Sequence, residues 1–229
     1  MLCRFPATSR RAILENVVDG TPAGTPVQGD DEDSLDEITY AITGGTGRDT
    51  FTVEAETGLL RYAAPAPLDF ESTPELTVQI KATDKAGASA SGLVTVSLVD
   101  VNEAPTTPLV QERSVREKVP VDTLVGAVLA VSDVDAGDSH EFAIIGGNSA
   151  GHFKLKGTTG QLLVAGSLDN QIQSLYTLTV RVVDSGFMSA TTTVNINVFD
   201  QNDPPVMTDR VFTVRAGRVP WPLYVVVYI

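Results

Sequence analysis

Two short acidic stretches, each ending in proline, decide how this chain is organised. Residues 100–105 read Asp-Val-Asn-Glu-Ala-Pro, and residues 200–205 read Asp-Gln-Asn-Asp-Pro-Pro. Proline restricts the backbone and stiffens a linker, so each stretch predicts a connection between two folded units. Their similarity also predicts an internal repeat, which is the sequence signature of modular architectures.

The residues ahead of the two stretches match one another over a long distance. Residues 13–61 lie over residues 115–163 without a gap, and residues 68–105 then lie over residues 168–205. We therefore predict a leader over residues 1–12, a first repeat over 13–105, a second repeat over 106–205, and the start of a truncated third repeat over 206–229. The leader lacks the apolar run of a signal peptide, and the strip 221–229 is interpreted as a truncated strand.

Each repeat shows the residue alternation of β structure. Apolar side chains at 76, 78, 80 and 82 alternate with polar ones, and the same alternation recurs at 176, 178, 180 and 182. Alternation with a period of two indicates a strand with one buried and one wet face. About seven such short strands per repeat predict an all-β chain of antiparallel sandwiches, joined end to end.

The composition limits the classes of partner. The chain has 29 acidic and 16 basic residues and a net charge of −13, which repels nucleic acid and anionic lipid head groups and favours cations. The single cysteine, Cys3, excludes an intrachain disulfide framework and a cysteine zinc site. No run of apolar residues is long enough for a membrane-spanning helix.

The acidic residues lie where strands are expected to end. If the sandwiches stack end to end, the acids at the bottom of the first repeat meet those at the top of the second. Two like charges 4 Å apart repel by about 4 kcal/mol at an effective dielectric constant of 20, so such a cluster requires cations. Carboxylate, amide and carbonyl oxygens suit Ca²⁺, and His140 and His152 are isolated in the sequence, which argues against zinc or copper.

The ordered set of motifs resembles the extracellular repeats of cadherins. The resemblance rests on Glu15 and Glu117 in the first strands, on Leu-Asp-Phe-Glu at 68–71, and on Asp-Val-Asp at 133–135. Ala-Thr-Asp at 82–84 and its counterpart at 182–184 belong to the set, and the linker at 100–105 is its most specific element. Together these motifs cover residues 13–205.

The resemblance implies a seven-stranded Greek-key sandwich for each repeat and three Ca²⁺ ions at the junction between repeats. Ligands of the outermost ion would be Glu15, Asp69, Glu71 and Glu103. Ligands of the middle ion would be Glu15, Glu71, Asp100, Glu103, Asp135 and the Val101 carbonyl. Ligands of the third ion would be Asn102, Asp133, Asp135, Asp184 and the Ala104 carbonyl. A further carbonyl ligand is expected near Asp138.

The chain departs from the family pattern in several places. Both linkers are one residue shorter than the usual form, Glu103 replaces an aspartate, and Gln171 replaces the second-repeat counterpart of Glu71. Two weaker half-sites are expected at the outer ends. One comprises Asp31, Asp33 and Asp84. The other comprises Glu117, Asp169, Asp200, Asn202 and Asp203.

The resemblance implies a calcium-binding adhesion module at the cell surface, which meets other cadherin-like repeats in cis or in trans, homophilically or heterophilically. Any membrane anchor would lie outside this chain. The alternative is an extracellular spacer, stiffened by Ca²⁺ but not adhesive, and adhesion by exchange of a first-strand tryptophan is not supported because the only tryptophan is Trp221.

An enzyme is not expected. The paired carboxylates Asp69 and Glu71 could be read as catalytic acids, but acidic residues recur here with the period of the repeat, as structural ligands do. The glycine-rich stretch 44–47 lacks the lysine of a phosphate-binding loop, so no small-molecule substrate is predicted.

Overall fold

The computed structural model describes residues 8–29, 37–64 and 66–205 as strands, turns and loops. The half-site residues Asp31 and Asp33, residues 1–7 of the predicted leader, and the predicted third repeat at 206–229 with its terminal strip lie outside the described residues. Within the described ranges, no helix is long and apolar enough to cross a bilayer.

Each repeat contains six strands among the described residues. The first repeat has β1 (Thr8–Leu14), β2 (Thr39–Gly44), β3 (Phe51–Val53), β4 (Leu60–Tyr62), β5 (Glu75–Thr83) and β6 (Ser89–Val99). The second has β7 (Val110–Arg116), β8 (Glu141–Gly146), β9 (Phe153–Lys156), β10 (Gln161–Val164), β11 (Leu175–Val183) and β12 (Ser189–Phe199). The sheet orders are β1-β6-β5-β2 with β3-β4, and β7-β12-β11-β8 with β9-β10. The predicted all-β sandwich class is confirmed.

The prediction of antiparallel pairing throughout is wrong for one pair in each repeat. β1 pairs with β6 in parallel, and β7 pairs with β12 in the same way. The chain enters a repeat at one end and leaves it at the other, so its first and last strands run in the same direction. This pairing places the residues that follow β1 and β6 side by side.

A seventh strand is not formed in either repeat among the described residues; residues 21–27 and 123–129 pair instead through one isolated bridge each, at Pro22 and Leu124. Ala23 and Val27 donate backbone hydrogen bonds to the carbonyls of Leu60 and Gly58 over 2.9 and 3.0 Å. Their counterparts in the second repeat donate to the carbonyls of Leu162 and Gly160 in the same manner. A glycine with positive φ, Gly24 or Gly126, interrupts each segment. A left-handed residue cannot continue an extended run, so the ladder is broken there.

Each repeat has its own hydrophobic core. The alternating residues of the long strands supply it, with Val78, Ile80 and Val96 fully buried in the first repeat and Leu178 and Val180 in the second. The two buried clusters have no member in common. The repeats are therefore separate folding units that meet through polar residues.

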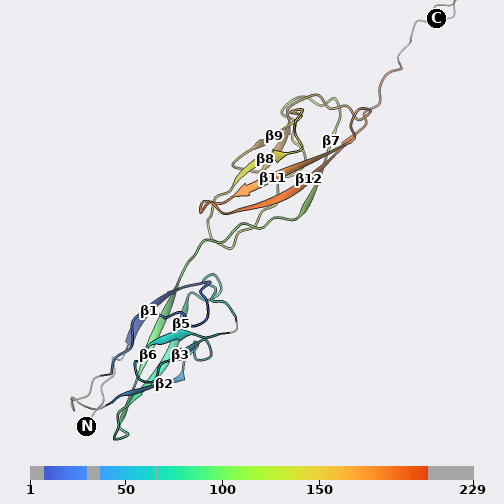
Figure 1. Ribbon diagram of the computed structural model, residues 1–229. Helices are drawn as coiled ribbons and strands as arrows, with labels where there is room; N and C mark the ends of the chain where they lie inside the picture. Colours follow the sequence, from blue (N-terminus) through green and yellow to red (C-terminus); the bar gives the residue numbers. More distant parts are fainter. Residues whose placement is uncertain (1–7, 30–36, 65, 206–229) are drawn as a thin grey trace, which may run out of the picture.

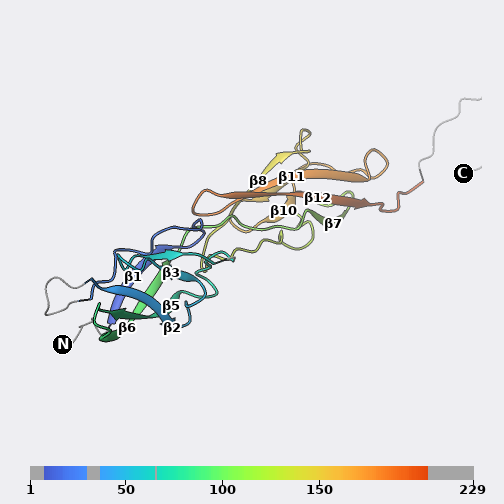
Figure 2. The ribbon, with the colours of Figure 1, turned by 60° about the horizontal axis from the view of Figure 1, so that its bottom comes forward.

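The two sandwiches lie end to end, and residues 100–109 run between them (Figures 1 and 2). The linker is attached to the second repeat, because the backbones of Thr106 and Ser132 exchange hydrogen bonds of 2.7 and 2.9 Å. At the other end, β1 begins at Thr8, inside the segment predicted as a leader. Polar residues such as Arg10 and Arg11 on this edge strand conceal its alternation in the sequence.

Candidate metal centre

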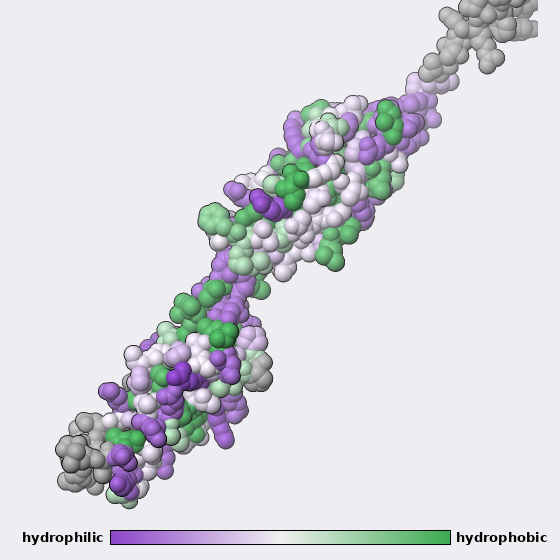
Figure 3. All heavy atoms as spheres, viewed as in Figure 1, coloured by the Kyte–Doolittle hydropathy of each residue, from purple (hydrophilic) through white to green (hydrophobic). Residues whose placement is uncertain are grey.

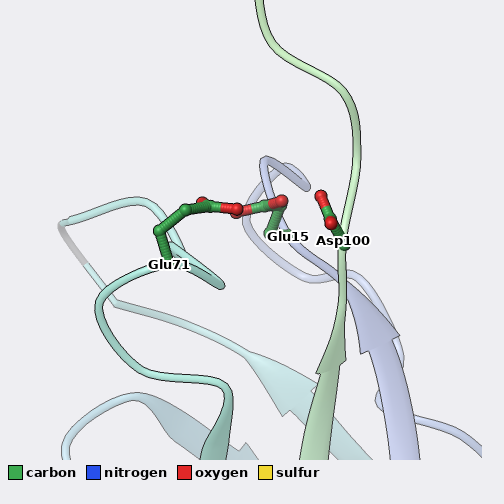
Figure 4. A group of neighbouring side chains, drawn as sticks. All are labelled: Glu15, Glu71 and Asp100. Atoms are coloured by element: carbon green, nitrogen blue, oxygen red, sulfur yellow. The ribbon is translucent and has the colours of Figure 1, made fainter. Parts of the chain in front are cut away.

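Most of the acidic residues predicted to bind metal lie in three groups at the ends of the repeats that face the linker. Hydrophilic residues are prominent on the surface of the narrow connection between the repeats (Figure 3). Glu15 directly follows β1, Asp100 directly follows β6, and Glu71 lies in the turn region between β4 and β5. Figure 4 shows these three side chains directed toward one another from three segments of the first repeat. The parallel pairing of β1 with β6 is what brings Glu15 beside Asp100.

Glu15 is the fixed centre of the first group of carboxylates. Its side chain is 2% exposed, and its two oxygens accept hydrogen bonds from the backbone N–H groups of Phe70, over 2.7 Å, and Val101, over 2.8 Å. Oxygens of Glu15, Glu71 and Asp100 lie within 4.8 Å of one another. Glu15 thus ties the turn that carries Glu71 to the start of the linker.

A second group of carboxylates joins the two repeats. Oxygens of Glu71, Glu103 and Asp135 lie within 4.8 Å of one another, although these residues belong to the first repeat, the linker and the second repeat. The N–H of Glu103 donates to Oδ2 of Asp135 over 2.8 Å. The side chain of Asn16 donates to the carboxylate of Glu103. This group is the direct polar bridge between the sandwiches.

The third group lies at the end of the second repeat that faces the first repeat. It comprises Asp133, Asp138 and Asp184, again with oxygens within 4.8 Å of one another. The sequence predicted a backbone carbonyl near Asp138 and missed its carboxylate, although the acid-rich stretch 133–138 is a visible signal. The interpretation of His140 as isolated is wrong, because its Nε2 lies 2.9 Å from Oδ2 of Asp133. Residues seven apart meet here through a loop, which spacing does not indicate.

Other predicted ligands are placed differently. Asp69 belongs to none of the three groups among the described residues, and its Oδ1 instead accepts the N–H of Ser72 over 3.0 Å. Asn102 reaches the third group, since its Nδ2 lies 3.1 Å from Oδ2 of Asp184. The Val101 N–H binds Glu15, and the carbonyls of Val101 and Ala104 stay predictions as ligands.

The crowding of carboxylates changes their acidity. Burial raises the pKa of Glu71, and the nearby charges of Glu15, Glu103 and Asp100 raise it further. Burial also raises the pKa of Asp100, and the charge of Asp135 raises it further. Burial raises the pKa of Glu103, although the hydrogen bond from Asn16 partly lowers it. In contrast, hydrogen bonds from Ser72 lower the pKa of Asp69. The junction therefore disfavours its own negative charge in the absence of cations.

The donor set fits a calcium ion. Three buried carboxylate oxygens have no hydrogen-bond partner among the described residues, namely Oε2 of Glu103, Oδ1 of Asp135 and Oδ2 of Asp138. Buried polar atoms are rarely left without a partner, so these oxygens are suited to contact a cation. Closely spaced carboxylates with side-chain amides and carbonyls nearby are the oxygen ligands that Ca²⁺ prefers.

The outer half-sites are incomplete in the described residues. At the end of the first repeat that faces away from the junction, Asp84 is buried, and its Oδ1 accepts the N–H of Ala88 over 2.9 Å. At the end of the second repeat, Glu117 is 0% exposed and accepts the N–H groups of Asn170 and Gln201 over 2.7 and 2.9 Å. These two hydrogen bonds lower the pKa of Glu117 to about 2.

Curated relatives contain stretches similar to this chain. Mouse "Cadherin EGF LAG seven-pass G-type receptor 2" is 34% identical over 219 residues, which cover 90% of this chain and 7% of the receptor. Rat "Protocadherin Fat 2" is 34% identical over 217 residues, which cover 88% of this chain and 5% of that protein. The chain thus spans less than a tenth of these relatives.

Solved structures show the same fold. The crystal structure of mouse Cadherin-23 EC22-24 superposes with a TM-score of 0.71 at 23% identity, covering 86% of this chain and 65% of that one. Human Protocadherin-24 EC1-2 superposes with a TM-score of 0.70 at 23% identity, covering 87% of this chain and 100% of that one.

A family model completes the comparison. The model of the cadherin domain matches twice, at residues 10–99 and 111–199. The predicted resemblance is confirmed, and the match to the cadherin domain supports the prediction that the chain is not an enzyme. The chain belongs to the cadherin family.

Proposed function

We propose that Ca²⁺ binds at the junction between the two repeats and fixes their relative orientation, within an extracellular module for cell adhesion. Other cadherin-like repeats, in cis or in trans, are the proposed partners. The observation that carries the proposal is the group of Glu71, Glu103 and Asp135, whose oxygens come from both repeats and the linker.

The mechanism is electrostatic and mechanical. Without cations, the carboxylates on the two repeats repel one another, as the raised pKa values of Glu71, Asp100 and Glu103 indicate. When bound, Ca²⁺ supplies the positive charge that converts this repulsion into attraction. Glu15 holds the turn and the linker in register, and the bonds between Thr106 and Ser132 hold the linker on the second repeat.

Our ligand assignment follows the three groups. At the end of the first repeat that faces the junction, ions would be held by Glu15, Glu71 and Asp100. The bridge to the second repeat would be made by Glu103 and Asp135. Asn102, Asp133 and Asp184 would hold the third ion, and Asp138 joins them because its Oδ2 is buried and unpaired among the described residues. Three ions are proposed in total. Asp69 would bind the outermost ion only if its carboxylate released the hydrogen bond from the N–H of Ser72.

The location follows from the chemistry of the ion. Extracellular calcium modules bind with dissociation constants of about 10⁻⁴ to 10⁻³ M, which suits the calcium level outside cells. The relative named as a seven-pass receptor supports a place at the cell surface.

The first test is a calorimetric calcium titration of the chain and of Asp135→Ala. We expect the variant to lose two of three ions, because Asp135 belongs to the middle group and the family pattern also assigns it to the third ion, while both repeats stay folded by circular dichroism. Asp49→Ala is the matched control, because its side chain is 99% exposed and belongs to none of the groups. Unchanged calcium binding by Asp135→Ala would overturn the ligand assignment.

A second test separates adhesion from the spacer alternative, which the end-to-end arrangement of the repeats also suits (Figure 1). Beads coated with the chain should aggregate in millimolar calcium and disperse in chelator. Beads coated with Asp135→Ala should not aggregate. Beads that stay dispersed while calorimetry shows bound calcium would support the spacer.

A further inference from the structure

The end of the second repeat carries the same residue positions as the end of the first. Glu117, Lys118 and Gln171 stand where the first repeat has Glu15, Asn16 and Glu71. The remaining counterparts are Asp169 for Asp69, Asp200 for Asp100 and Asp203 for Glu103. All of these residues are described at both ends, so the two ends can be compared without any later part of the chain.

Position 16 and its counterpart 118 point their side chains in the same way. Asn16 has a φ of 54° and Lys118 a φ of 56°, so both adopt the left-handed conformation directly after the buried glutamate. In the first repeat the Asn16 amide donates to the Glu103 carboxylate. In the second repeat the Lys118 ammonium contacts the counterpart carboxylate of Asp203. The same backbone geometry thus delivers a neutral amide at one end and a positive charge at the other.

The Lys118 ammonium lies among the residues that correspond to ligands of the outermost ion. Its Nζ is 3.4 Å from Oε1 of Glu117 and pairs with Asp203. The neighbouring Gln171 lacks the negative charge of its counterpart Glu71. Its Nε2 donates to Oδ1 of Asp200 over 2.7 Å. At the first end, no lysine or arginine pairs with the acids of the outermost set in the part of the chain that the structure describes.

We propose that Lys118 is a built-in cation that takes the place of the outermost metal ion at the end of the second repeat. This inference rests on the proposed calcium function of the first junction. An ammonium is a compact point charge on a flexible stem, so it can pair with two carboxylates at once and offset one of their two negative charges without a metal. A Ca²⁺ ion at this position would have to displace the ammonium and would find an amide of Gln171 where the first end has a carboxylate. The two ends of one repeat fold would therefore differ in calcium demand.

The test exchanges the two residues between the ends in the full chain. Equilibrium dialysis should show one additional Ca²⁺ per chain for the double variant Lys118→Asn with Gln171→Glu. It should show one fewer for Asn16→Lys with Glu71→Gln. Lys156→Asn, which removes an exposed lysine on β9, is the control and should leave the number of ions unchanged.

Thermal melting in chelator gives a readout that does not depend on bound metal. Lys118→Asn should lower the melting temperature of the second repeat in chelator, because Glu117 and Asp203 lose their positive partner. Added calcium should raise the melting temperature of the variant that also carries Gln171→Glu more than that of Lys118→Asn alone, beyond the gain that both share from the first junction. Asn16→Lys should raise the melting temperature of the first repeat in chelator.

The outcomes separate the inference from the function on which it rests. If the unmodified chain binds no calcium up to several millimolar, the proposed function fails. If it binds calcium in a manner that Asp135→Ala reduces, but the Lys118→Asn and Gln171→Glu variant gains no ion, the function stands and the inference about Lys118 is overturned. A melting temperature that Lys118→Asn leaves unchanged in chelator would also overturn it.

Discussion

The ends of the two repeats share a scaffold and differ in charge. In both, a glutamate after the first strand is buried and accepts two backbone N–H groups, from Phe70 and Val101 for Glu15 and from Asn170 and Gln201 for Glu117. At the first end the neighbouring acids have raised pKa values, with burial as the main cause. At the second, the pKa of Glu117 falls to about 2, mainly through those backbone hydrogen bonds.

This difference teaches that the backbone of the repeat does not by itself determine a metal site. The backbone hydrogen bonds to the buried glutamate are shared, and the change in charge lies in two side chains, Asn16 against Lys118 and Glu71 against Gln171. A repeat can therefore keep its fold while the charge at its end is adjusted. The following predictions challenge the comparison, beginning with the largest expected effect.

Removal of the buried glutamate should have the largest effect at either end. Glu15→Ala leaves two backbone N–H groups without an acceptor, and each buried unpaired donor costs about 1–3 kcal/mol. We expect a loss of about 2–6 kcal/mol in the unfolding free energy of the first repeat, measured by urea denaturation in chelator. Glu117→Ala should cost the second repeat a similar amount.

The increase in unfolding free energy on adding calcium should differ between these two variants. Calcium should stabilise the Glu117→Ala chain nearly as much as the unmodified chain, and stabilise Glu15→Ala much less. Glu56→Ala, an exposed acid on the first repeat, should change neither value. Equal rescue of both glutamate variants by calcium would show that the two ends do not differ as described.

The response to pH in chelator should be intermediate in size and opposite at the two ends. A group with a raised pKa in the folded state contributes stability below its unfolded pKa and loses it as the pH rises through the folded value. The first repeat, with Glu71, Asp100 and Glu103, should therefore gain stability as the pH falls from neutral toward the ordinary values of 4.5 for the glutamates and 3.8 for the aspartate.

Glu117 should respond with the other sign. Its lowered pKa contributes stability above the unfolded value of 4.5, and this contribution is lost as the pH falls toward about 2. Amide signals of the two repeats, followed by NMR during thermal melts at several pH values, would check both trends. A second repeat that gained stability between pH 4.5 and 2 would contradict the assignment of Glu117.

A partly exposed ion pair outside the three groups of acids should have the smallest effect. Arg61 pairs with Glu54 over 2.6 Å on the first repeat, where the second repeat has Leu163 and Lys156. Exposed pairs contribute about 0–1 kcal/mol, so Arg61→Leu should cost no more than that in urea denaturation. Unchanged calcium binding is the accompanying control, and a cost well above 2 kcal/mol would mean that this difference between the repeats is structural.

Much of the fold could be predicted because the same alternation of apolar and polar residues occurs in both repeats. The alternation at 76–82 and 176–182 marked the buried strands, and the structure buries Val78, Ile80, Leu178 and Val180. The predicted seventh strand is not formed among the described residues, since one glycine with positive φ breaks each segment. The parallel pairing of β1 with β6 was also missed, because direction is a property of the whole path of the chain.

The candidate site was predicted in part. Acids at strand ends pointed to Glu15, Glu71, Asp100, Glu103 and Asp135, which the structure brings into two groups. Asp69 was included by position in a motif, but its carboxylate caps its own turn. The carboxylate of Asp138 and the contact of His140 with Asp133 were missed, because both depend on how one loop closes.

The sequence by itself determined the module: its repeat period, its alternating strands, its acidic linker and the family to which it belongs. These features can be identified along the chain, because each depends only on the order of residues. Only the tertiary structure decided which acids share an ion-sized space and that Lys118 occupies the counterpart position. The reason is electrostatic: the interaction of two charges depends on their distance and burial, and both are set by segments that lie far apart in the chain.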